Sequence, residues 1–275
     1  MIATEMIRKS LRPLCALHTL ALAVALMAGC AAPSMAPSSA EVQALAPTGK
    51  LRVGLYPGTP TSIIGSASSG NARGVGFDIG RELAMHSGVP FEPVVFPNNA
   101  EVFAAAKSGS VDVVFTNATP ARMKDLDFSP TFLQVEQGYL VPAASPIRTL
   151  DEVDRAGVKV GVSAGSTSEA SLSREFRKAT VVRVPSLKAA TDMLRAGELQ
   201  AFATNKATLF EMSDELAGSR VLAGRWGLES FAIGIPKGRE AALPLLRRFV
   251  ADAKASGSVA RVVDRAGLRG SVPAE

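Results

Sequence analysis

From residue 50 onwards the chain alternates short β-rich runs with helical patterns, and this alternation constrains its fold more than any other feature. Expected strands lie at 51–55, 91–96, 111–115, 159–163, 181–184, 200–203 and 230–236. Helical patterns lie between them, at 77–87, 99–108, 149–156, 166–178, 186–196 and 205–216. Strands separated by helices form βαβ units, so the sequence predicts an α/β fold with a mainly parallel sheet.

Two helical patterns open with a capping box, in which a hydroxyl and a carboxylate satisfy free backbone N–H groups at the helix start. Thr149 is followed by Glu152 at the required spacing, and Ser166 is followed by Glu169. These pairs indicate helix starts near residues 149 and 166.

The series of βαβ units is interrupted twice. It stops at an extended run over 138–142 and starts again after Ser145-Pro146. A second extended run, at 230–236, is followed only by helical patterns at 240–255 and 258–266. Two such crossings, with a complete α/β block between them, predict two lobes joined by two hinge strands.

The crossings assign residues 50–141 and 232–275 to a first lobe and residues 142–231 to a second. Ligands of open α/β sheets bind beyond the carboxyl ends of the strands. Two such lobes facing each other form a cleft that closes by hinge motion. We therefore expect the ligand site in the cleft between the lobes.

The start of the chain carries an export pattern. Basic residues precede an apolar run over 14–27, which is shorter than the roughly 20 residues that a spanning helix needs. We therefore predict a signal peptide over residues 1–29. No later segment approaches that length without charged residues, so the mature body is expected to be soluble.

The predicted signal peptide ends in Met27-Ala28-Gly29-Cys30. This run resembles a bacterial lipobox, with Met27 where Leu is usual, and implies that Cys30 becomes the lipidated first residue of a periplasmic lipoprotein. Cleavage after Ala32 or Ala40 would instead give a freely soluble periplasmic protein. Residues 30–49, rich in Pro, Ala and Ser, are expected to form a tether with nothing to bury.

Composition excludes several classes of function. The 30 Lys and Arg residues against 25 Asp and Glu give a net charge of only +5, and no dense basic patch is present, so nucleic-acid binding is not expected. Three of the four Cys and His residues lie at or before residue 30, and His86 alone cannot build a His/Cys metal site. The glycine-rich run at 74–80 is neither a dinucleotide fingerprint nor a P-loop. We therefore expect no metal and no cofactor.

A series of short motifs runs along the body of the chain: GFDIGRELA at 76–84, SVDVV at 110–114, TPAR at 119–122, LDFSP at 126–130, VGVSAGST at 160–167 and LRAGELQA at 194–201. In this order and spacing the motifs resemble the bacterial solute-binding protein family 3, the receptors of polar-amino-acid ABC importers. The resemblance covers about residues 50–270. It implies a two-lobed periplasmic-binding-protein fold of type II, a ligand that carries a carboxylate, and no catalysis. It also implies an inner-membrane ABC permease as the partner of a monomer.

The resemblance implies roles for several residues at the expected cleft. Arg122 would hold the ligand carboxylate, because a guanidinium forms two parallel hydrogen bonds with a carboxylate. Ser166 and Thr167 would hold the same carboxylate from the second lobe, since N–H groups and hydroxyls at a helix start form an anion site. Thr119, in the turn before Arg122, is a further expected ligand contact.

Other positions depart from the family, and they bear on the ligand. Amino-acid receptors commonly hold the ammonium with an aspartate, where this chain has Asn205. Tyr56 stands where an acid is common in the family, and Asn117 stands where Ser or Thr is usual. Asn99 or Asn98, and Thr59, stand where many members place an aromatic ring against the ligand. An ammonium in a closed cleft needs a compensating charge or several acceptors. The anion half of the site is therefore expected to be retained and its cation half weakened.

Two ligand classes stay open at this point. One is an amino acid whose ammonium meets Asn117, Asn205, Tyr56 and backbone carbonyls, with Glu136 as a candidate for the charge. The other is a small anion without an ammonium, such as an organic acid, which the departures favour slightly. Glu136 also fits a solvated residue near the hinge, and we favour that interpretation.

Two other functions also stay open. Some dehydratases that act on prephenate or arogenate resemble this family, and such an enzyme needs an acid that protonates the leaving hydroxyl. Only Glu136 and Glu169 are candidates for that acid, and Glu169 is expected in a helix cap. The other function is a partner that presents ligand to a sensor kinase. We predict a binding protein rather than an enzyme.

Overall fold

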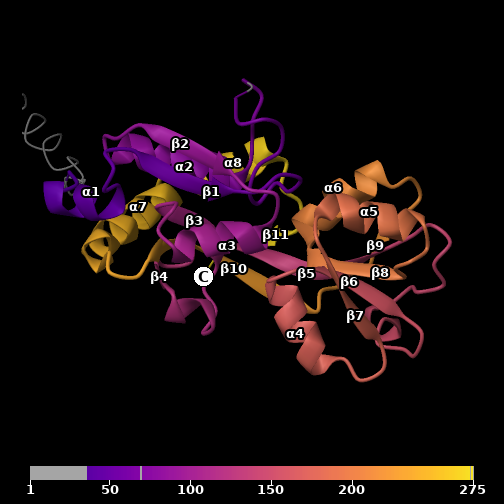
Figure 1. Ribbon diagram of the computed structural model, residues 1–275. Coiled ribbons are helices and arrows are strands. Elements are labelled where there is room, and N and C mark those ends of the chain that lie inside the picture. Colours follow the sequence, from indigo (N-terminus) through magenta and orange to yellow (C-terminus); the bar gives the residue numbers. More distant parts are fainter. Residues whose placement is uncertain (1–35, 69, 273, 275) are drawn as a thin grey trace, which may run out of the picture. The chain divides into compact units, whose positions relative to one another are not determined.

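The computed structural model describes residues 36–68, 70–272 and 274 (Figure 1). The predicted signal peptide and the predicted lipid site at Cys30 lie outside the described residues. Residues 37–275 form one compact unit, to which everything below refers. Within the described ranges, no helix is both long enough and apolar enough to cross a membrane.

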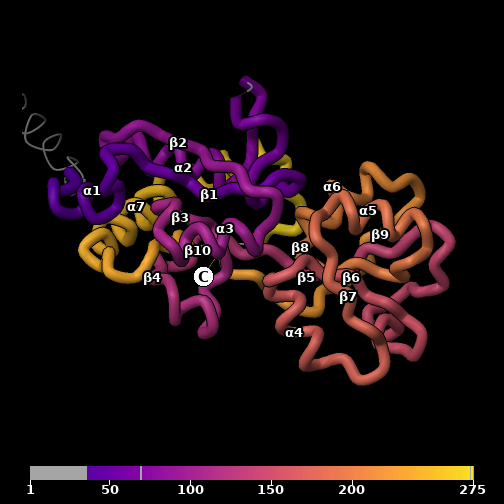
Figure 2. Tube along the Cα trace, viewed as in Figure 1, coloured from indigo at the N-terminus to yellow at the C-terminus, as the bar shows by residue number. Residues whose placement is uncertain are grey.

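The first lobe is built on three parallel strands with β1 (Leu51–Leu55) at the centre, between β2 (Phe91–Val95) and β3 (Val113–Asn117). Two helices connect these strands, α2 (Val75–His86) and α3 (Asn99–Lys107). The chain returns to this lobe at its end with η3 (Glu240–Ala242), α7 (Leu243–Ala255) and α8 (Ser258–Ala266). Segments from the two ends of the described chain therefore lie side by side here, as α1 (Ser39–Leu45) against α7 (Figure 2) and α2 against α8 (Figure 1).

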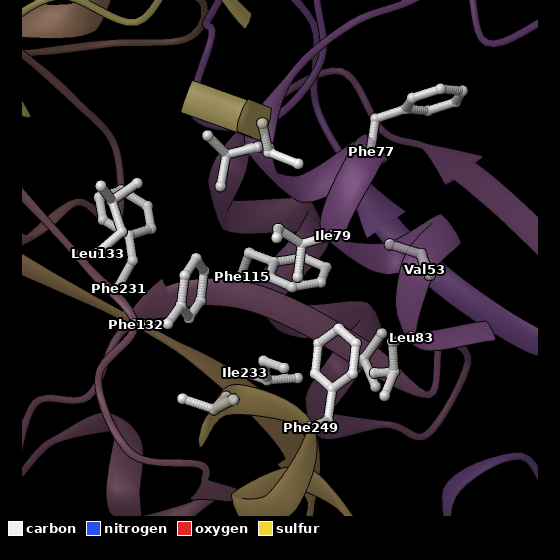
Figure 3. Packing of buried hydrophobic residues seen from close by; sticks show 14 of the residues in the cluster. Val53, Phe77, Ile79, Leu83, Phe115, Phe132, Leu133, Phe231, Ile233 and Phe249 are labelled. Carbon is white, nitrogen blue, oxygen red and sulfur yellow. The ribbon is translucent and has the colours of Figure 1, made fainter. Parts of the chain in front are cut away.

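The core of the first lobe joins strand and helix residues from both parts of the chain. Val53 of β1, Ile79 of α2 and Phe249 of α7 are at most 5% exposed and pack in one cluster (Figure 3). Phe115 and Phe231 belong to the same cluster. Helix α2 begins directly after Gly74, where φ is +147° and a Cβ would lie 2.3 Å from the Ser62 carbonyl oxygen, so only glycine fits there.

The second lobe repeats the arrangement with β6 (Lys159–Ser163) between β7 (Thr180–Val184) and β8 (Ala201–Asn205), all parallel. Its helices are α4 (Thr167–Glu175), α5 (Leu187–Arg195) and α6 (Lys206–Glu215). Two clusters of buried residues form its core, one around Val160 and Val162 and the other around the fully buried Phe202.

Two long antiparallel strands join the lobes, β5 (Leu133–Val141) and β10 (Gly227–Pro236). β10 pairs with β3 in the first lobe and β5 pairs with β8 in the second, which makes one sheet of order β2-β1-β3-β10-β5-β8-β6-β7. Three short strands add to it: β4 (Leu126–Phe128) beside β10, and β9 (Arg220–Val221) and β11 (Ser271–Val272) beside β5. The structure confirms the predicted α/β class and the two strands that cross between lobes.

The expectation of a tether over residues 30–49 is wrong for its second half. Helix α1 (Ser39–Leu45) forms there, and Ser38 and Glu41 cap it reciprocally. Arg248 of α7 donates two 2.9 Å hydrogen bonds to the Glu41 carboxylate, and Leu45 and Ala46 are at most 2% exposed. The composition of this segment is typical of a linker, but its capping box and its apolar Leu45 are signals of a docked helix.

The helix expected over 149–156 is only a single turn, η2 (Leu150–Glu152). Its predicted capping box is present, but the turn does not continue into an α-helix. Asp154 instead accepts hydrogen bonds of 2.8–3.0 Å from the N–H groups of Arg177, Lys178 and Ala179. These bonds hold the connection between α4 and β7, and they lower the pKa of Asp154.

Two strands end further along the chain than expected, and both ends lie at the cleft. β3 ends at Asn117 and β8 at Asn205, although the sequence predicts ends at residues 115 and 203. Polar residues at a strand end suggest a turn, but here Asn117 pairs with Phe231 and Asn205 pairs with Gln137 of the crossing strands. The crossing strands therefore extend both ladders to the cleft.

Candidate functional site

A small cavity of about 30 Å³, partly open to solvent, lies where the two lobes meet the crossing strand β10. The first lobe contributes one part of its wall: Tyr56, Asn99, Phe115, Thr116 and Arg122. The second lobe contributes the larger part: Ser163, Ser166, Thr167, Ser168, Leu187, Thr204, Asn205 and Thr208. β10 contributes Glu229 and Phe231.

Arg122 brings a positive charge to the cavity. It begins the short turn η1 (Arg122–Lys124), is only 7% exposed, and lies 5.7 Å from the centre of the Phe103 ring. Its Nη1 donates to Thr116 Oγ1 at 2.6 Å and to the Asn117 carbonyl at 3.3 Å, and Nη2 donates across the cleft to the Gly165 carbonyl at 3.2 Å. Burial lowers the pKa of this guanidinium, but an arginine stays charged in proteins.

Glu229 brings a negative charge to the same cavity, and it is not among the site residues predicted from the sequence. Its Oε1 accepts a 2.7 Å hydrogen bond from the Thr167 hydroxyl, and its Oε2 accepts a 3.1 Å bond from the Asn205 amide. Thr167 begins α4 and Asn205 is the N-cap of α6. Helix N-termini favour negative charge, so both helix starts stabilise this carboxylate.

One signal in the sequence could have found Glu229. Residues two apart in a strand face the same side. Phe231 lies in the expected strand 230–236, and Glu229 precedes it by two positions. The observed strand starts earlier, at Gly227, and both side chains line the cavity.

Asn205 lies in the cavity wall as predicted, but its amide oxygen is already engaged. That oxygen accepts hydrogen bonds from the Thr208 N–H at 3.1 Å and from the Thr208 hydroxyl at 3.0 Å. The amide NH₂ donates to Glu229. Asn205 therefore holds a carboxylate in place, where the sequence suggested a direct acceptor for an ammonium.

Three other predicted residues also line the cavity: Tyr56, Asn99 and Ser166. Burial raises the pKa of Tyr56 to about 12, so its phenol is neutral at physiological pH. Ser166 Oγ accepts the Glu169 N–H at 3.1 Å, which is one of the two bonds of the predicted capping box; the second bond, from the Ser166 N–H to Glu169, is replaced by one from Gly165. The Glu169 carboxylate accepts the Gly165 N–H at 2.7 Å and thereby fixes the loop whose carbonyl meets Arg122.

Asn117 and Thr119 are not among the residues that line the cavity. Asn117 Oδ1 accepts the Ser230 N–H of β10 at 3.3 Å, and Thr119 Oγ1 accepts the Arg122 N–H at 3.3 Å. The Asn117 side chain therefore ties the end of β3 to β10, and the Thr119 side chain shapes the turn that presents Arg122.

Glu136, the candidate for the missing charge, is engaged elsewhere. Lys206 Nζ lies 2.6 Å from one of its carboxylate oxygens and Arg225 Nη1 lies 3.2 Å from the other. The hydrogen bond from Lys206 lowers the pKa of Glu136. Glu136 does not line the cavity, so the candidate role as its source of charge is wrong and the favoured position near the hinge is retained.

Thr59 and Asn98 have structural partners. Asn98 caps α3 through the Glu101 N–H at 3.0 Å. Thr59 is fully buried, and its hydroxyl lies 2.7 Å from the hydroxyl of Thr208 in the second lobe. Across the described residues, no group of three or more His, Cys, Asp and Glu side chains is arranged to hold a metal ion.

Comparisons with known proteins agree with this architecture. The ABC transporter glutamine-binding protein GlnH of Bacillus subtilis is 26% identical over 192 residues, which cover 66% of this chain and 69% of that protein. The structure of the solute receptor for L-cysteine of Neisseria gonorrhoeae superposes with a TM-score of 0.73 at 23% identity, over 82% of this chain and 92% of that one.

A third similar structure is an ancestral amino acid-binding protein described as a precursor of cyclohexadienyl dehydratase. It has a TM-score of 0.70 and 22% identity, over 82% of this chain and 98% of that one. At this identity, both structural likenesses establish the two-lobed fold alone. The family model of the bacterial extracellular solute-binding proteins matches residues 51–267. The chain therefore belongs to the bacterial extracellular solute-binding proteins, family 3.

Proposed function

We propose that this protein is the exported substrate-binding component of an ABC importer, and that it binds an amino acid in the cleft between its lobes. Arg122 would hold the ligand carboxylate and Glu229 the ligand ammonium. The observation that carries this proposal is the presence of one guanidinium and one carboxylate in the wall of the same small cavity.

Arg122 has hydrogen-bonding capacity left for a ligand. A guanidinium has five N–H donors. Thr116, Asn117 and Gly165 accept three hydrogen bonds from it. The remaining donors suit the two oxygens of a carboxylate, and the turn residues that bond to Arg122 fix its orientation before the ligand arrives.

Glu229 has acceptor capacity left as well. A carboxylate offers about four lone-pair sites, and Thr167 and Asn205 use two of them. Both of these partners are neutral, so the negative charge of Glu229 is not compensated within hydrogen-bond distance. An ammonium would supply that compensation. Glu229 would thus form the cation-binding half of the site, which the sequence alone predicts to be weakened.

This geometry favours an amino acid over an amine-free organic acid. An amine-free acid would bring a second carboxylate into a closed cleft that holds a single guanidinium. One of the two carboxylates would then be a buried charge without a partner, which is strongly unfavourable. The slight preference for an anion without an ammonium rests on neutral residues such as Asn205, Tyr56 and Asn117. Glu229 brings a carboxylate to the cavity and so supports the amino-acid alternative.

Thermal unfolding of the mature protein tests this proposal against a panel of amino acids and their amine-free analogues. A ligand present at about 100 times its Kd stabilises the folded state by roughly 2.7 kcal/mol, which is a shift of several degrees. We expect amino acids to raise the melting temperature by clearly more than their amine-free analogues do at the same concentration. The opposite pattern, in which only the amine-free acids raise it, would contradict the proposal.

The N-terminal region supports the proposal of a lipid anchor at Cys30. Cleavage after Ala40 would remove Ser38 and cut into α1, which packs on the first lobe through Glu41 and Leu45. Cleavage before Cys30 or after Ala32 would preserve this helix. Mass spectrometry of the mature N-terminus separates the two outcomes, because only the first leaves acyl chains on Cys30.

A catalytic role as a dehydratase has less support. A general acid must carry a proton that it can donate to the leaving group. Glu229 accepts hydrogen bonds from two donors, and Glu136 is held by Lys206 and Arg225. Glu169 lines no part of the cavity and is bonded to the Gly165 N–H and to Arg183. We therefore propose binding without catalysis; release of water from prephenate by the purified protein would contradict this.

Co-purification from detergent-solubilised membranes separates an importer component from the partner of a sensor kinase. We expect an ABC permease to be retained by the ligand-loaded protein. Retention of a sensor kinase in its place would contradict the importer assignment and leave the ligand proposal intact.

A further inference from the structure

The charged side chains in the wall of the cavity balance one another. Arg122 carries one positive charge and Glu229 one negative charge, and the other residues in the wall are uncharged. Tyr56 is neutral because burial raises its pKa to about 12. The two charged groups of an amino acid backbone would therefore use every charge that the described cavity wall offers.

Asn205 is the residue that keeps this balance. Its side chain caps α6, and aspartate is as good an N-cap as asparagine, so the cap alone does not require an amide. The amide is required on its other side, where its NH₂ group lies 3.1 Å from a carboxylate oxygen of Glu229. An aspartate at this position would place a second negative charge against Glu229.

We propose that Asn205 is a specificity-determining residue that restricts the cleft to amino acids with uncharged side chains. This inference rests on the proposed function. A charged side chain would be a third charged group on the ligand, and the cleft has no partner left for it. Taking such a charge out of water is costly. The uncharged groups on the first-lobe side of the wall, Tyr56 and Asn99, suit a neutral side chain.

The test compares pairs of amino acids that match in shape and differ in charge. Suitable pairs are citrulline with arginine, and homoserine with the analogue in which an ammonium replaces its hydroxyl. Calorimetric titration of the mature protein gives the affinity ratio within each pair. We expect the neutral member to bind at least about tenfold more tightly, since a tenfold ratio needs a difference of only about 1.4 kcal/mol.

Two variants assign this preference to Asn205. In Asn205→Asp the cleft gains a negative charge, and we expect the ratio within a pair to fall or to reverse in favour of the cation. The double variant Asn205→Asp with Glu229→Gln again has a single negative charge, now at the start of α6. We expect its preference for the neutral member of each pair to return. Melting temperatures of the ligand-free variants report whether each one folds.

The possible outcomes are distinct. Equal or tighter binding of the cationic members by the unmodified protein would overturn the inference and leave amino-acid binding intact. The same holds if Asn205→Asp weakens both members of a pair equally, because Asn205 would then act only in the structure. Binding of amine-free acids in place of every amino acid tested would contradict the proposed function itself.

Discussion

Two glutamates occupy adjacent places on the crossing strands and have opposite roles. In the β5–β10 pair, Glu229 lies opposite Val135 and Glu136 lies opposite Leu228. Neighbouring positions along a strand face opposite sides, so a step of one residue directs Glu229 into the cavity and Glu136 away from it.

The partners of the two carboxylates differ in the same way. Glu136 contacts two cations, Lys206 and Arg225, whereas Glu229 contacts the neutral donors Thr167 and Asn205. A carboxylate whose charge is already compensated stabilises the hinge region. A carboxylate oriented by neutral donors keeps its charge available for a ligand cation.

The largest expected effect comes from removing the charge of Glu229, which turns the proposed counter-ion of the ligand into a neutral side chain. Glu229→Gln keeps the size of the side chain and removes its charge, so a bound ammonium loses its counter-ion. Removing one partner of a buried charge pair costs about 2–5 kcal/mol. We expect calorimetry to show at least a 30-fold loss of amino-acid affinity, since each 1.4 kcal/mol is about tenfold. Glu136→Gln is the matched control and should bind the ligand as the unmodified protein does.

The next effect concerns the positive side of the cavity. Arg122→Lys keeps the charge but cannot form two parallel hydrogen bonds with a carboxylate, and a lysine cannot keep all the bonds to Thr116, Asn117 and Gly165. We expect a loss of affinity of about tenfold or more. Unchanged affinity would show that the ligand carboxylate lies elsewhere.

A smaller effect is expected where the lobes touch beside the cavity. Thr208→Val removes the hydroxyl that bonds to Thr59 in the first lobe and to Asn205. A typical hydrogen bond contributes about 1 kcal/mol net. We expect affinity to fall about fivefold through faster ligand dissociation, because the variant closes less firmly. Stopped-flow measurements that show an unchanged dissociation rate would exclude a role of this contact in closure.

The smallest effect concerns stability and pH at Glu136. Its folded pKa lies below the ordinary glutamate value of about 4.3, chiefly because Lys206 donates a hydrogen bond to it. Its ion pairs therefore contribute fully above that pH, and the contribution is lost as the pH falls through the lowered folded pKa. Glu136→Gln should lower the free energy of unfolding by about 1 kcal/mol or less at neutral pH. Urea titrations should show this difference disappear in acid; a difference that grows in acid would contradict the assignment.

Hydrophobic patterning and motif order could predict the fold because both are local in the sequence. The strands at Leu51–Leu55 and Lys159–Ser163 and the helix at Ser258–Ala266 have the predicted bounds. Helix α1 was missed because the surrounding Pro, Ala and Ser residues are typical of a linker, although Ser38 and Glu41 carried the signal.

Of the two residues proposed to bind the ligand, Arg122 was predictable from the sequence and Glu229 was not. Arg122 belongs to a local motif, whereas Glu229 reaches the cavity through strand register and meets Asn205, a residue 24 positions earlier. Asn205 viewed alone indicates a lost charge. Only the pairing of β5 with β10 and of β5 with β8 brings a carboxylate from another strand beside Asn205.

The most direct test of the central claim is the coupling between the Glu229 carboxylate and the ligand ammonium. Four dissociation constants measure it: those of the unmodified protein and of Glu229→Gln, each for an amino acid and for its amine-free analogue. We predict a coupling free energy of at least about 1.5 kcal/mol, the lower end of values for close charge pairs at interfaces. A coupling near zero, with both proteins folded and binding, would show that Glu229 does not contact the ammonium and would contradict the account.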